Sequence, residues 1–420
     1  MLNLSFNFLK NIKSFIFPFY RNKDLKFIFK KLQEGIPGDK VAARFVGGCV
    51  RKHLSNEKID DIDIATILTT DQIKEKFKDT NLKVIDTGVK HGTVTIVSEN
   101  HKVELTTLRK DIKTDGRHAE VEYTDSWQQD SERRDFTINA IYMDINGKLY
   151  DPQMGTVDLK NKNIKFIGDP QKRIEEDYLR IVRFIRFKVM YDIVVEPTTS
   201  DAIKQNLDGI QKISKERILI ELLKILSLKN FLTINQSSNL REIFSMIFPE
   251  FLYLNRLERL KKAFQYLEVN LDILLAVLLI DEKDNHEYFI HKYNASNKTR
   301  ETLKKFNKNL IKLKNDEEFF EKDLIKNVYL NGKNHLIALN LINYTINSRV
   351  KRDDFSKTLK KIFKTKTPVF PIDGEALKKK GMQEGQSLGN VLKTLEKEWM
   401  NNNFKISNER VEELIKVNSN

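Results

Sequence analysis

The sequence predicts an α+β protein in which a strand-containing part precedes a long helical part. Apolar and polar residues alternate in short runs between residues 41 and 108, as in half-buried strands. From Asp169 onward the alternation stops, and apolar residues recur at the three- and four-residue spacing of helices. No run of eighteen apolar residues occurs, so we expect no membrane-spanning helix.

The elements expected before Asp169 are short and have recognisable ends. Residues 24–36 carry apolar side chains at helical spacing and end at a Gly-Ile-Pro-Gly turn. The following elements are expected to be a strand at 41–46, a helix at 48–55, a strand at 61–67, a helix at 71–78 capped by Thr70 or Asp71, and strands at 84–85, 93–97 and 102–108. Residues 109–130 are polar and indicate a loop, marked by Asp115-Gly116, and residues 150–168 indicate strands and turns.

The composition points to a polyanionic partner. The formal net charge is +14, with a sequence pI near 9.4, which favours nucleic acid over an anionic membrane surface. The single Cys49 excludes an intrachain disulfide and fits a reducing, cytoplasmic compartment. Residues 1–23 contain no acidic residue, and we interpret them as an N-terminal extension that forms an amphipathic helix. The alternative is an organellar targeting segment.

A glycine pair and two spaced aspartates form the first candidate site. Gly47 and Gly48 follow a short apolar run, and glycines let backbone N–H groups approach a phosphate closely. Asp61 and Asp63 are one residue apart, so on a strand their side chains point to the same face. Two carboxylates on one strand suit Mg²⁺, and a phosphate cradle before them indicates phosphoryl transfer with two metal ions.

These residues together resemble the head motif of the nucleotidyltransferase superfamily. G-G-x-V-R followed by D-I-D-I-A-T is similar, more narrowly, to the class II tRNA nucleotidyltransferases, which include CCA-adding enzymes and bacterial poly(A) polymerases. Lys52 departs from the family pattern, which usually has an acidic residue after the arginine. The resemblance implies a polymerase-β-like head with a mixed β-sheet, followed by an all-α neck, body and tail. The expected bounds are 1–23 for the extension, 24–168 for the head, 169–230 for the neck, 231–367 for the body and 368–420 for the tail.

Two further segments of the head also resemble family motifs. V-E-L-T-T-L-R carries Glu104, which the resemblance makes a third carboxylate and the base that deprotonates the attacking hydroxyl; the alternative is a solvated strand residue. D-G-R-H-A, residues 115–119, resembles the flexible loop that the family associates with the final adenosine step.

A pair of arginines is the strongest match to the family. Arg133 and Arg134 suit a triphosphate because each guanidinium offers a planar fork of donors. They belong to R-R-D-F-T-I-N-A, in which the resemblance implies that Asn139 orients the ribose or the loop. We expect Asp135 to hold an arginine rather than a metal ion.

The segment E-D-Y-L-R is expected to select the base. Asp177 and Arg180 are three residues apart, which makes them neighbours on a helix; the simplest interpretation is a surface ion pair. Alternatively, the carboxylate accepts the amino group of CTP or ATP while the guanidinium donates to the adjacent ring nitrogen, and UTP and GTP are mispaired. The family motif implies this second role. Arg183 and Arg186 are candidate base or phosphate contacts, and we expect Glu216 and Glu221 to brace these arginines.

The function expected from this resemblance is Mg²⁺-dependent addition of CCA to the 3′ end of tRNA without a nucleic-acid template. CTP and ATP are the substrates, with Gly47, Gly48, Arg51 and the arginine pair on the triphosphate. The glycines and lysines of the tail are expected to contact tRNA, and no stable protein partner is expected. Two alternatives remain: a poly(A) polymerase of the same family, and a non-catalytic RNA-binding protein with the same fold.

Overall fold

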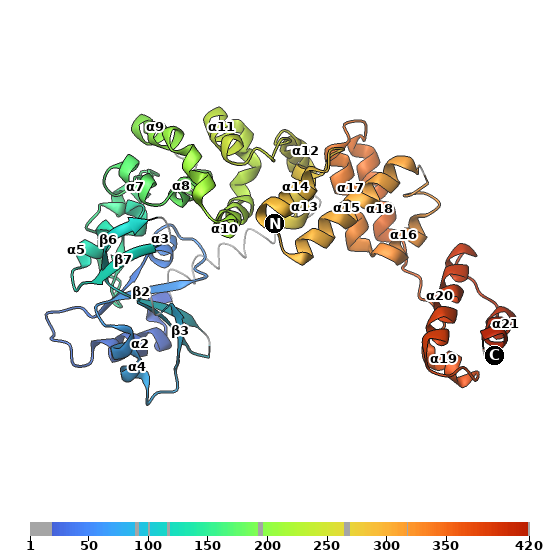
Figure 1. Ribbon diagram of the computed structural model, residues 1–420, viewed down its shortest axis with the longest axis horizontal. Coiled ribbons are helices and arrows are strands. Elements are labelled where there is room, and N and C mark those ends of the chain that lie inside the picture. Colours follow the sequence, from blue (N-terminus) through green and yellow to red (C-terminus); the bar gives the residue numbers. More distant parts are fainter. Residues whose placement is uncertain are drawn as a thin grey trace. The chain divides into compact units, whose positions relative to one another are not determined.

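The computed structural model describes residues 19–88, 92–99, 101–115, 118–191, 196–263, 269–316 and 318–418. The chain forms two compact units, Met1–Pro249 and Glu250–Asn420. All strands within the described residues belong to the first unit, and the second unit is helical (Figure 1). The expected α+β class is therefore confirmed. The expected helix at the N-terminal extension falls almost entirely outside the described residues.

A seven-stranded mixed sheet is the centre of the head. Its strand order is β3-β4-β5-β2-β1-β8-β9, and only β2 and β5 pair in parallel. The parallel register places Asp63 on β2 directly beside Glu104 on β5. The strands are β1 (Ala43–Val46), β2 (Ile62–Thr66), β3 (Lys83–Gly88), β4 (Thr93–Val97), β5 (Lys102–Thr107), β8 (Tyr142–Met143) and β9 (Leu149–Tyr150).

Two helices cover one face of this sheet. Helices α2 (Lys23–Gln33) and α4 (Thr70–Phe77) lie side by side (Figure 1), and their apolar side chains share one buried cluster with those of the strands. Ile62 and Ile64 belong to this cluster, so the alternation of β2 turns Asp63 to the opposite face. The cap of α4 is Thr69, through a capping box with Gln72, and not Thr70 or Asp71 as expected.

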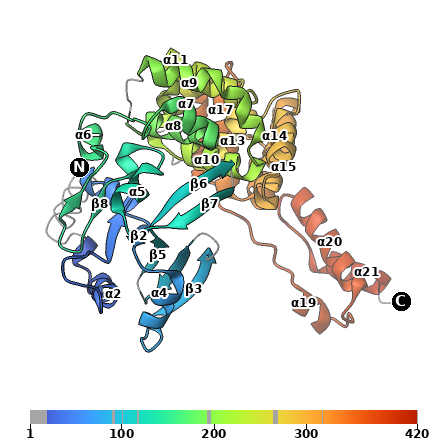
Figure 2. The same ribbon diagram turned by 60° about the vertical axis from the view of Figure 1, so that its left-hand side comes forward.

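The polar segment after β5 is not a loop. It forms a two-stranded ribbon, β6 (Arg109–Asp115) and β7 (His118–Tyr123), next to α5 (Trp127–Glu132) (Figure 2). Backbone pairing joins the two strands, and the cross-strand ion pair Lys110–Glu122 (3.1 Å) adds to it, so the ribbon forms without an alternating apolar face. The tip of the expected flexible loop, residues 116–117, lies outside the described residues. Residues 150–168, where strands and turns were expected, contain turns and one β-bridge, but also the unexpected helix α6 (Gly155–Lys160).

The helices after the head are interrupted at the segment expected to select the base. Helix α7 ends at Glu176 and α8 begins at Leu179, while Asp177 is extended (φ −155°, ψ 101°). Asp177 and Arg180 are thus not on one helix, contrary to the prediction. The helical elements of this part are α7 (Pro170–Glu176), α8 (Leu179–Tyr191), α9 (Pro197–Gln205), η4 (Leu207–Lys212), α10 (Lys215–Leu226), η5 (Lys229–Gln236) and α11 (Ser238–Ile247).

The second unit contains a helical bundle and a small C-terminal cluster. In the C-terminal cluster, Leu377, Val391 and Leu395 pack against α21. None of the described helices is long and apolar enough to cross a membrane. The bundle consists of α12 (Arg256–Ala263), α13 (Leu271–Leu279), α14 (Asn285–Tyr293), α15 (Asn297–Asn315), α16 (Leu324–Asn331), α17 (Lys333–Ile346) and α18 (Arg352–Lys364), and the cluster of α19 (Gly374–Lys379), α20 (Gln386–Asn401) and α21 (Asn408–Asn418).

Candidate active site

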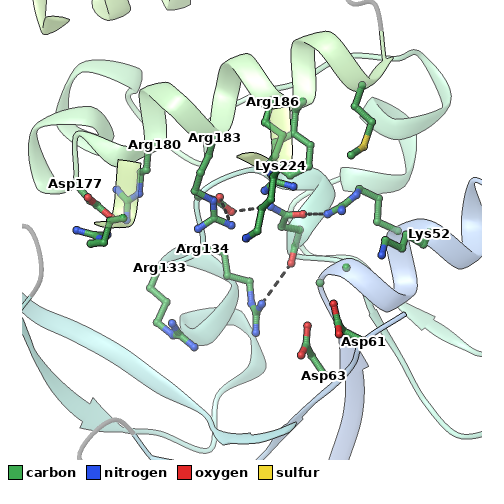
Figure 3. A pocket seen from close by; sticks show the side chains of 18 of the residues that line it. Lys52, Asp61, Asp63, Arg133, Arg134, Asp177, Arg180, Arg183, Arg186 and Lys224 are labelled. Atoms are coloured by element: carbon green, nitrogen blue, oxygen red, sulfur yellow. Dashed lines mark hydrogen bonds and ion pairs between the residues drawn. The ribbon is translucent and has the colours of Figure 1, made fainter. Parts of the chain in front are cut away.

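A cavity of about 950 Å³ lies within the first unit. Its walls come from α3 (Gly48–Leu54), β2, the turn after α5, the α7–α8 junction, and α10. Asp61 and Asp63 lie near one end of the cavity, Asp177 and Arg180 lie at the other, and arginines fill the space between them (Figure 3). A cavity of this size accommodates a nucleotide.

The glycine pair opens α3 at the edge of the cavity. Gly47 is the N-cap and has φ 73° and ψ −128°, a conformation that side-chain-bearing residues rarely adopt. A Cβ at Gly47 would lie 3.8 Å from an Asp63 carboxylate oxygen and 3.9 Å from Arg134 Nη1. The start of α3 therefore lies between an acid and an arginine.

The two spaced aspartates bring negative charges close together. Burial, the charge of Glu104 and the charge of Asp61 raise the pKa of Asp63, while Arg134 opposes the shift, and the resulting value is about 6. Neither carboxylate forms a hydrogen bond or ion pair with another described residue. Glu104 is close enough to act on Asp63, but it is exposed and is not among the residues that line the cavity.

The donor set fits a hard divalent cation. A cation between Asp61 and Asp63 would offset the burial and the neighbouring carboxylate charges that together raise the pKa of Asp63. No group of three acidic, histidine or cysteine side chains within the described residues has a geometry that could hold a metal ion. Mg²⁺ commonly binds to one or two carboxylates and completes its shell with water and substrate phosphates, which matches this arrangement.

The two tandem arginines share one buried acid. Asp130 contacts Arg133 Nη2 at 2.8 Å and Arg134 Nη2 at 3.0 Å, and it also accepts the Tyr142 hydroxyl at 2.7 Å. Burial alone would raise the pKa of Asp130, but the two guanidinium groups hold it well below its usual range. Asp130 thus fixes both arginines at the cavity wall.

The arginines of α8 are also held by acids. Arg183 pairs with buried Asp135 at 2.9 Å, as expected for Asp135, and Arg186 pairs with Glu221 of α10 at 2.8 Å. Burial opposes the charge of Asp135, yet Arg183 keeps its pKa lowered. Glu221 braces Arg186 as predicted, whereas Glu216 is exposed and forms no ion pair with α8 among the described residues. Arg51 donates a hydrogen bond to Asn139 and contacts the Tyr191 hydroxyl at 3.1 Å.

Asp177 and Arg180 have separate partners at the α7–α8 junction. Asp177 accepts Arg217 Nη2 at 2.7 Å and the backbone N–H of Leu179 at 3.2 Å. Arg180 Nη1 donates to Glu176 at 2.6 Å. The surface ion pair between Asp177 and Arg180 is therefore not formed, and the simpler of the two interpretations is wrong.

Two parts of the chain match known families. Residues 43–165 match the Poly A polymerase head domain, and residues 192–254 match the probable RNA and SrmB-binding site of polymerase A. The CCA tRNA nucleotidyltransferase 1, mitochondrial, of Danio rerio is 32% identical over 386 residues, which cover 88% of this chain and 85% of the relative. The chain belongs to the class II tRNA nucleotidyltransferases.

Other members of the family agree in sequence and fold. The CCA-adding enzyme of Staphylococcus haemolyticus is 32% identical over 317 residues, covering 75% of this chain and 76% of that protein. The crystal structure of the Bacillus stearothermophilus CCA-adding enzyme in complex with CTP has a TM-score of 0.67 at 24% identity, covering 94% of this chain and 96% of that one. The latter comparison supports the fold.

The structure brings nearly all the residues predicted for this tRNA nucleotidyltransferase to one cavity. Glu104 is the exception. Sequence reasoning missed Asp130, Tyr142 and Arg173, which hold the arginines in place, and assigned no function to Glu176 or Arg217. The spacing of Asp130, three and four residues before the arginine pair, was a usable signal. The predicted residues that line the cavity are Gly47, Gly48, Arg51, Asp61, Asp63, Arg133, Arg134, Asn139, Asp177, Arg180, Arg183 and Arg186.

The close approach of η4 to the α7–α8 junction predicts a sensitive glycine. A Cβ at Gly209 would lie 2.1 Å from the ring of Tyr178, the neighbour of Asp177. We expect Gly209→Ala to lower the free energy of unfolding by about 1–3 kcal/mol, the usual cost of overpacking. Gly389→Ala is the matched control, because nothing lies within 4 Å of that position in α20 and alanine favours a helix. Equal stability of the two variants in urea unfolding would contradict this packing.

The raised pKa of Asp63 predicts a pH-dependent gain of stability in Asp63→Asn. The folded-state pKa of about 6 exceeds the ordinary 3.8, so the charged carboxylate destabilises the fold above pH 6. With EDTA present at pH 8, we expect the variant to be more stable by up to about 3 kcal/mol. This gain should shrink as the pH falls from 6 toward 4.

Urea unfolding across this pH range measures the effect. Asp60→Asn is the control, because exposed Asp60 pairs with Lys52 and Lys58 and these hydrogen bonds lower its pKa. This control should not gain stability at pH 8. A gain in Asp63→Asn that stays constant with pH would show that the ionised carboxylate of Asp63 is not its cause.

Proposed function

We propose that this protein adds CMP, CMP and AMP to the 3′ end of tRNA, using CTP and ATP without a nucleic-acid template. The observation that carries the proposal is one cavity with Asp61 and Asp63 near one end, Asp177 and Arg180 at the other, and arginines between them (Figure 3). The CCA-adding names of its relatives support the same activity.

The phosphate end of the cavity is assigned to the start of α3 and the arginine pair. We assign the triphosphate to backbone N–H groups at the beginning of α3 and to Arg51, Arg133 and Arg134, all of which line the cavity. Asp61 and Asp63 would hold Mg²⁺, which supplies charge stabilisation at the phosphorus under attack. Glu104 remains our candidate base for the attacking 3′-hydroxyl of tRNA, and its proximity to Asp63 supports that assignment.

The base is assigned to the α7–α8 junction. Asp177 is an acceptor, and the described hydrogen bonds of Arg180 use Nη1, so we assign Nη2 to the base. CTP and ATP present an amino donor beside a ring-nitrogen acceptor and pair with both groups. UTP and GTP present the opposite order and would leave buried groups mispaired, which a site of this kind rejects strongly. Asn139 is proposed to orient the ribose, and Arg183 and Arg186 are proposed to contact the base or the phosphates.

The C-terminal tail is assigned to tRNA, and the compartment is assigned from the composition. We propose that residues 368–420 contact tRNA; Lys378 and Lys380 are paired with acids of the tail, so RNA phosphates would have to compete with these ion pairs. The Danio rerio relative is named mitochondrial. We keep the cytoplasm as the proposed compartment and an organellar targeting segment at residues 1–23 as the alternative.

Extension of defined RNA tests the function. The purified chain, Mg²⁺ and each labelled nucleotide are incubated with tRNA ending at the discriminator base, at C74, or at C75. We expect two CMP additions followed by one AMP addition, and then termination. Continued AMP addition to any RNA 3′ end would identify a poly(A) polymerase, and tRNA binding without extension would identify a non-catalytic RNA-binding protein.

The carboxylates give a second prediction in the same assay. Asp61→Asn and Asp63→Asn should each lower kcat by at least about a hundredfold, because the metal ion would lose one of its two protein ligands. The affinity for tRNA, measured by filter binding, should remain within about twofold, because these substitutions remove no lysine or arginine that could contact RNA phosphates. Asp60→Asn, one residue away, should retain activity. Near-normal turnover in either site variant would show that these residues do not hold the catalytic metal.

A further inference from the structure

Arg173 of α7 connects two groups of residues that line the cavity, although it does not line the cavity itself. Its Nη2 donates to the backbone carbonyl oxygens of Arg133 at 2.7 Å and Arg134 at 2.5 Å. Its Nη1 donates to Glu176 Oε2 at 2.5 Å. One guanidinium thus holds the backbone of the arginine pair and a carboxylate at the α7–α8 junction.

The same carboxylate oxygen holds the arginine assigned to the base. Arg180 Nη1 donates to Glu176 Oε2 at 2.6 Å and to the backbone carbonyl oxygen of Arg173 at 2.6 Å. Continuous hydrogen bonds therefore run from Arg180 through Glu176 and Arg173 to the backbone of residues 133–134. This connection joins the wall of the cavity that faces the base to the wall that faces the phosphates.

The connection is forked, and its two arginines are largely buried, whereas the Glu176 side chain is 29% exposed. The side chains of Arg173 and Arg180 are 11% and 10% exposed. Burial lowers the pKa of Arg173, and its Nε is buried without a hydrogen-bond partner among the described residues. An unpaired buried donor costs stability, so stability alone does not account for an arginine here. The planar fork, which reaches two carbonyls and one carboxylate together, does account for it.

We propose that Arg173 is a positioning residue that couples recognition of the base to alignment of the triphosphate. This inference rests on the proposed function. Correct pairing at Arg180 keeps Glu176 in place, and through Arg173 it keeps residues 133–134 in the position that aligns the α-phosphate. A base that displaces Arg180 disturbs the same hydrogen bonds, so the wrong nucleotide is both bound poorly and misaligned. Displacements of about 1 Å at a reacting centre cost on the order of a hundredfold in rate.

Arg173→Lys tests this coupling. Lysine keeps the charge but offers one ammonium group, which cannot contact two carbonyls and Glu176 together. We expect kcat for CTP and ATP to fall about 10- to 100-fold while KM changes less than about threefold, because alignment rather than binding is lost. The preference for CTP over UTP, measured as the ratio of kcat/KM values, should fall at least about tenfold.

Arg259→Lys is the matched control. Arg259, in the second unit, donates to the carbonyl oxygens of Tyr344 (2.7 Å) and Val350 (2.7 Å), so it shares the carbonyl contacts of Arg173 and does not line the cavity. This variant should lose stability and keep wild-type kcat and nucleotide preference. If Arg173→Lys behaves like the control, with altered stability and unchanged kcat and preference, the proposal is wrong.

A double-mutant cycle separates coupling from independent damage. If Arg173 acts through Arg180, then adding Arg173→Lys to Arg180→Ala should lower the nucleotide preference little further. Preferences that fall by the product of the single effects would overturn the proposal. Should Arg173→Lys lose its cooperative thermal transition, Glu176→Gln carries the same test, because it removes the charge shared by Arg173 and Arg180. A wild-type protein that fails to extend tRNA overturns the proposed function, whereas normal extension with unchanged preference in Arg173→Lys overturns only the coupling.

Discussion

The site depends on pairing its arginines with acids that are buried or half-buried. A cavity that binds a triphosphate must gather positive charge, and unpaired guanidinium groups would repel one another there. Each acid in the structure solves part of this problem: Asp130 holds two arginines, Asp135 holds one, and Glu176 holds two. Buried ion pairs contribute little net stability, but breaking one is costly. Their effect here is therefore to fix the directions of the guanidinium groups before the substrate arrives.

This pairing also explains why the cavity includes parts of both the head and the following helices. The arginine pair lies just after α5, whereas Arg180 and Arg183 lie on α8. Asp135, which follows the arginine pair, reaches across to Arg183, and Arg173 reaches back to residues 133–134. The base end and the phosphate end are consequently fixed by the same set of contacts within one unit.

The sequence predicted the sheet better than the ribbon and the junction. Strand β2 was predictable because its apolar residues alternate with aspartates and pack under α2 and α4. The β6–β7 ribbon was not, because cross-strand polar pairs leave no apolar period. No glycine or proline stands next to the helix break before Leu179, so the local sequence does not predict it. It depends on tertiary contacts, namely Arg217 on Asp177 and Tyr178 against Gly209, which local sequence does not reveal.

The residues of the site could be predicted where the type of side chain and the spacing both pointed to one function. The role of Lys52 could not be predicted in this way. The family pattern has an acidic residue after Arg51. From the sequence, the lysine at this position indicated only that a local ion pair is absent. In the structure Lys52 lines the cavity, pairs with Asp60 at 3.3 Å, and acts to lower the pKa of Asp63. An acid at this position would instead add to the repulsion among Asp61, Asp63 and Glu104. Lys52 thus offsets part of the negative charge of Asp61 and Asp63 before a cation binds. This effect depends on the position of the Lys52 side chain on α3, which the sequence alone does not show.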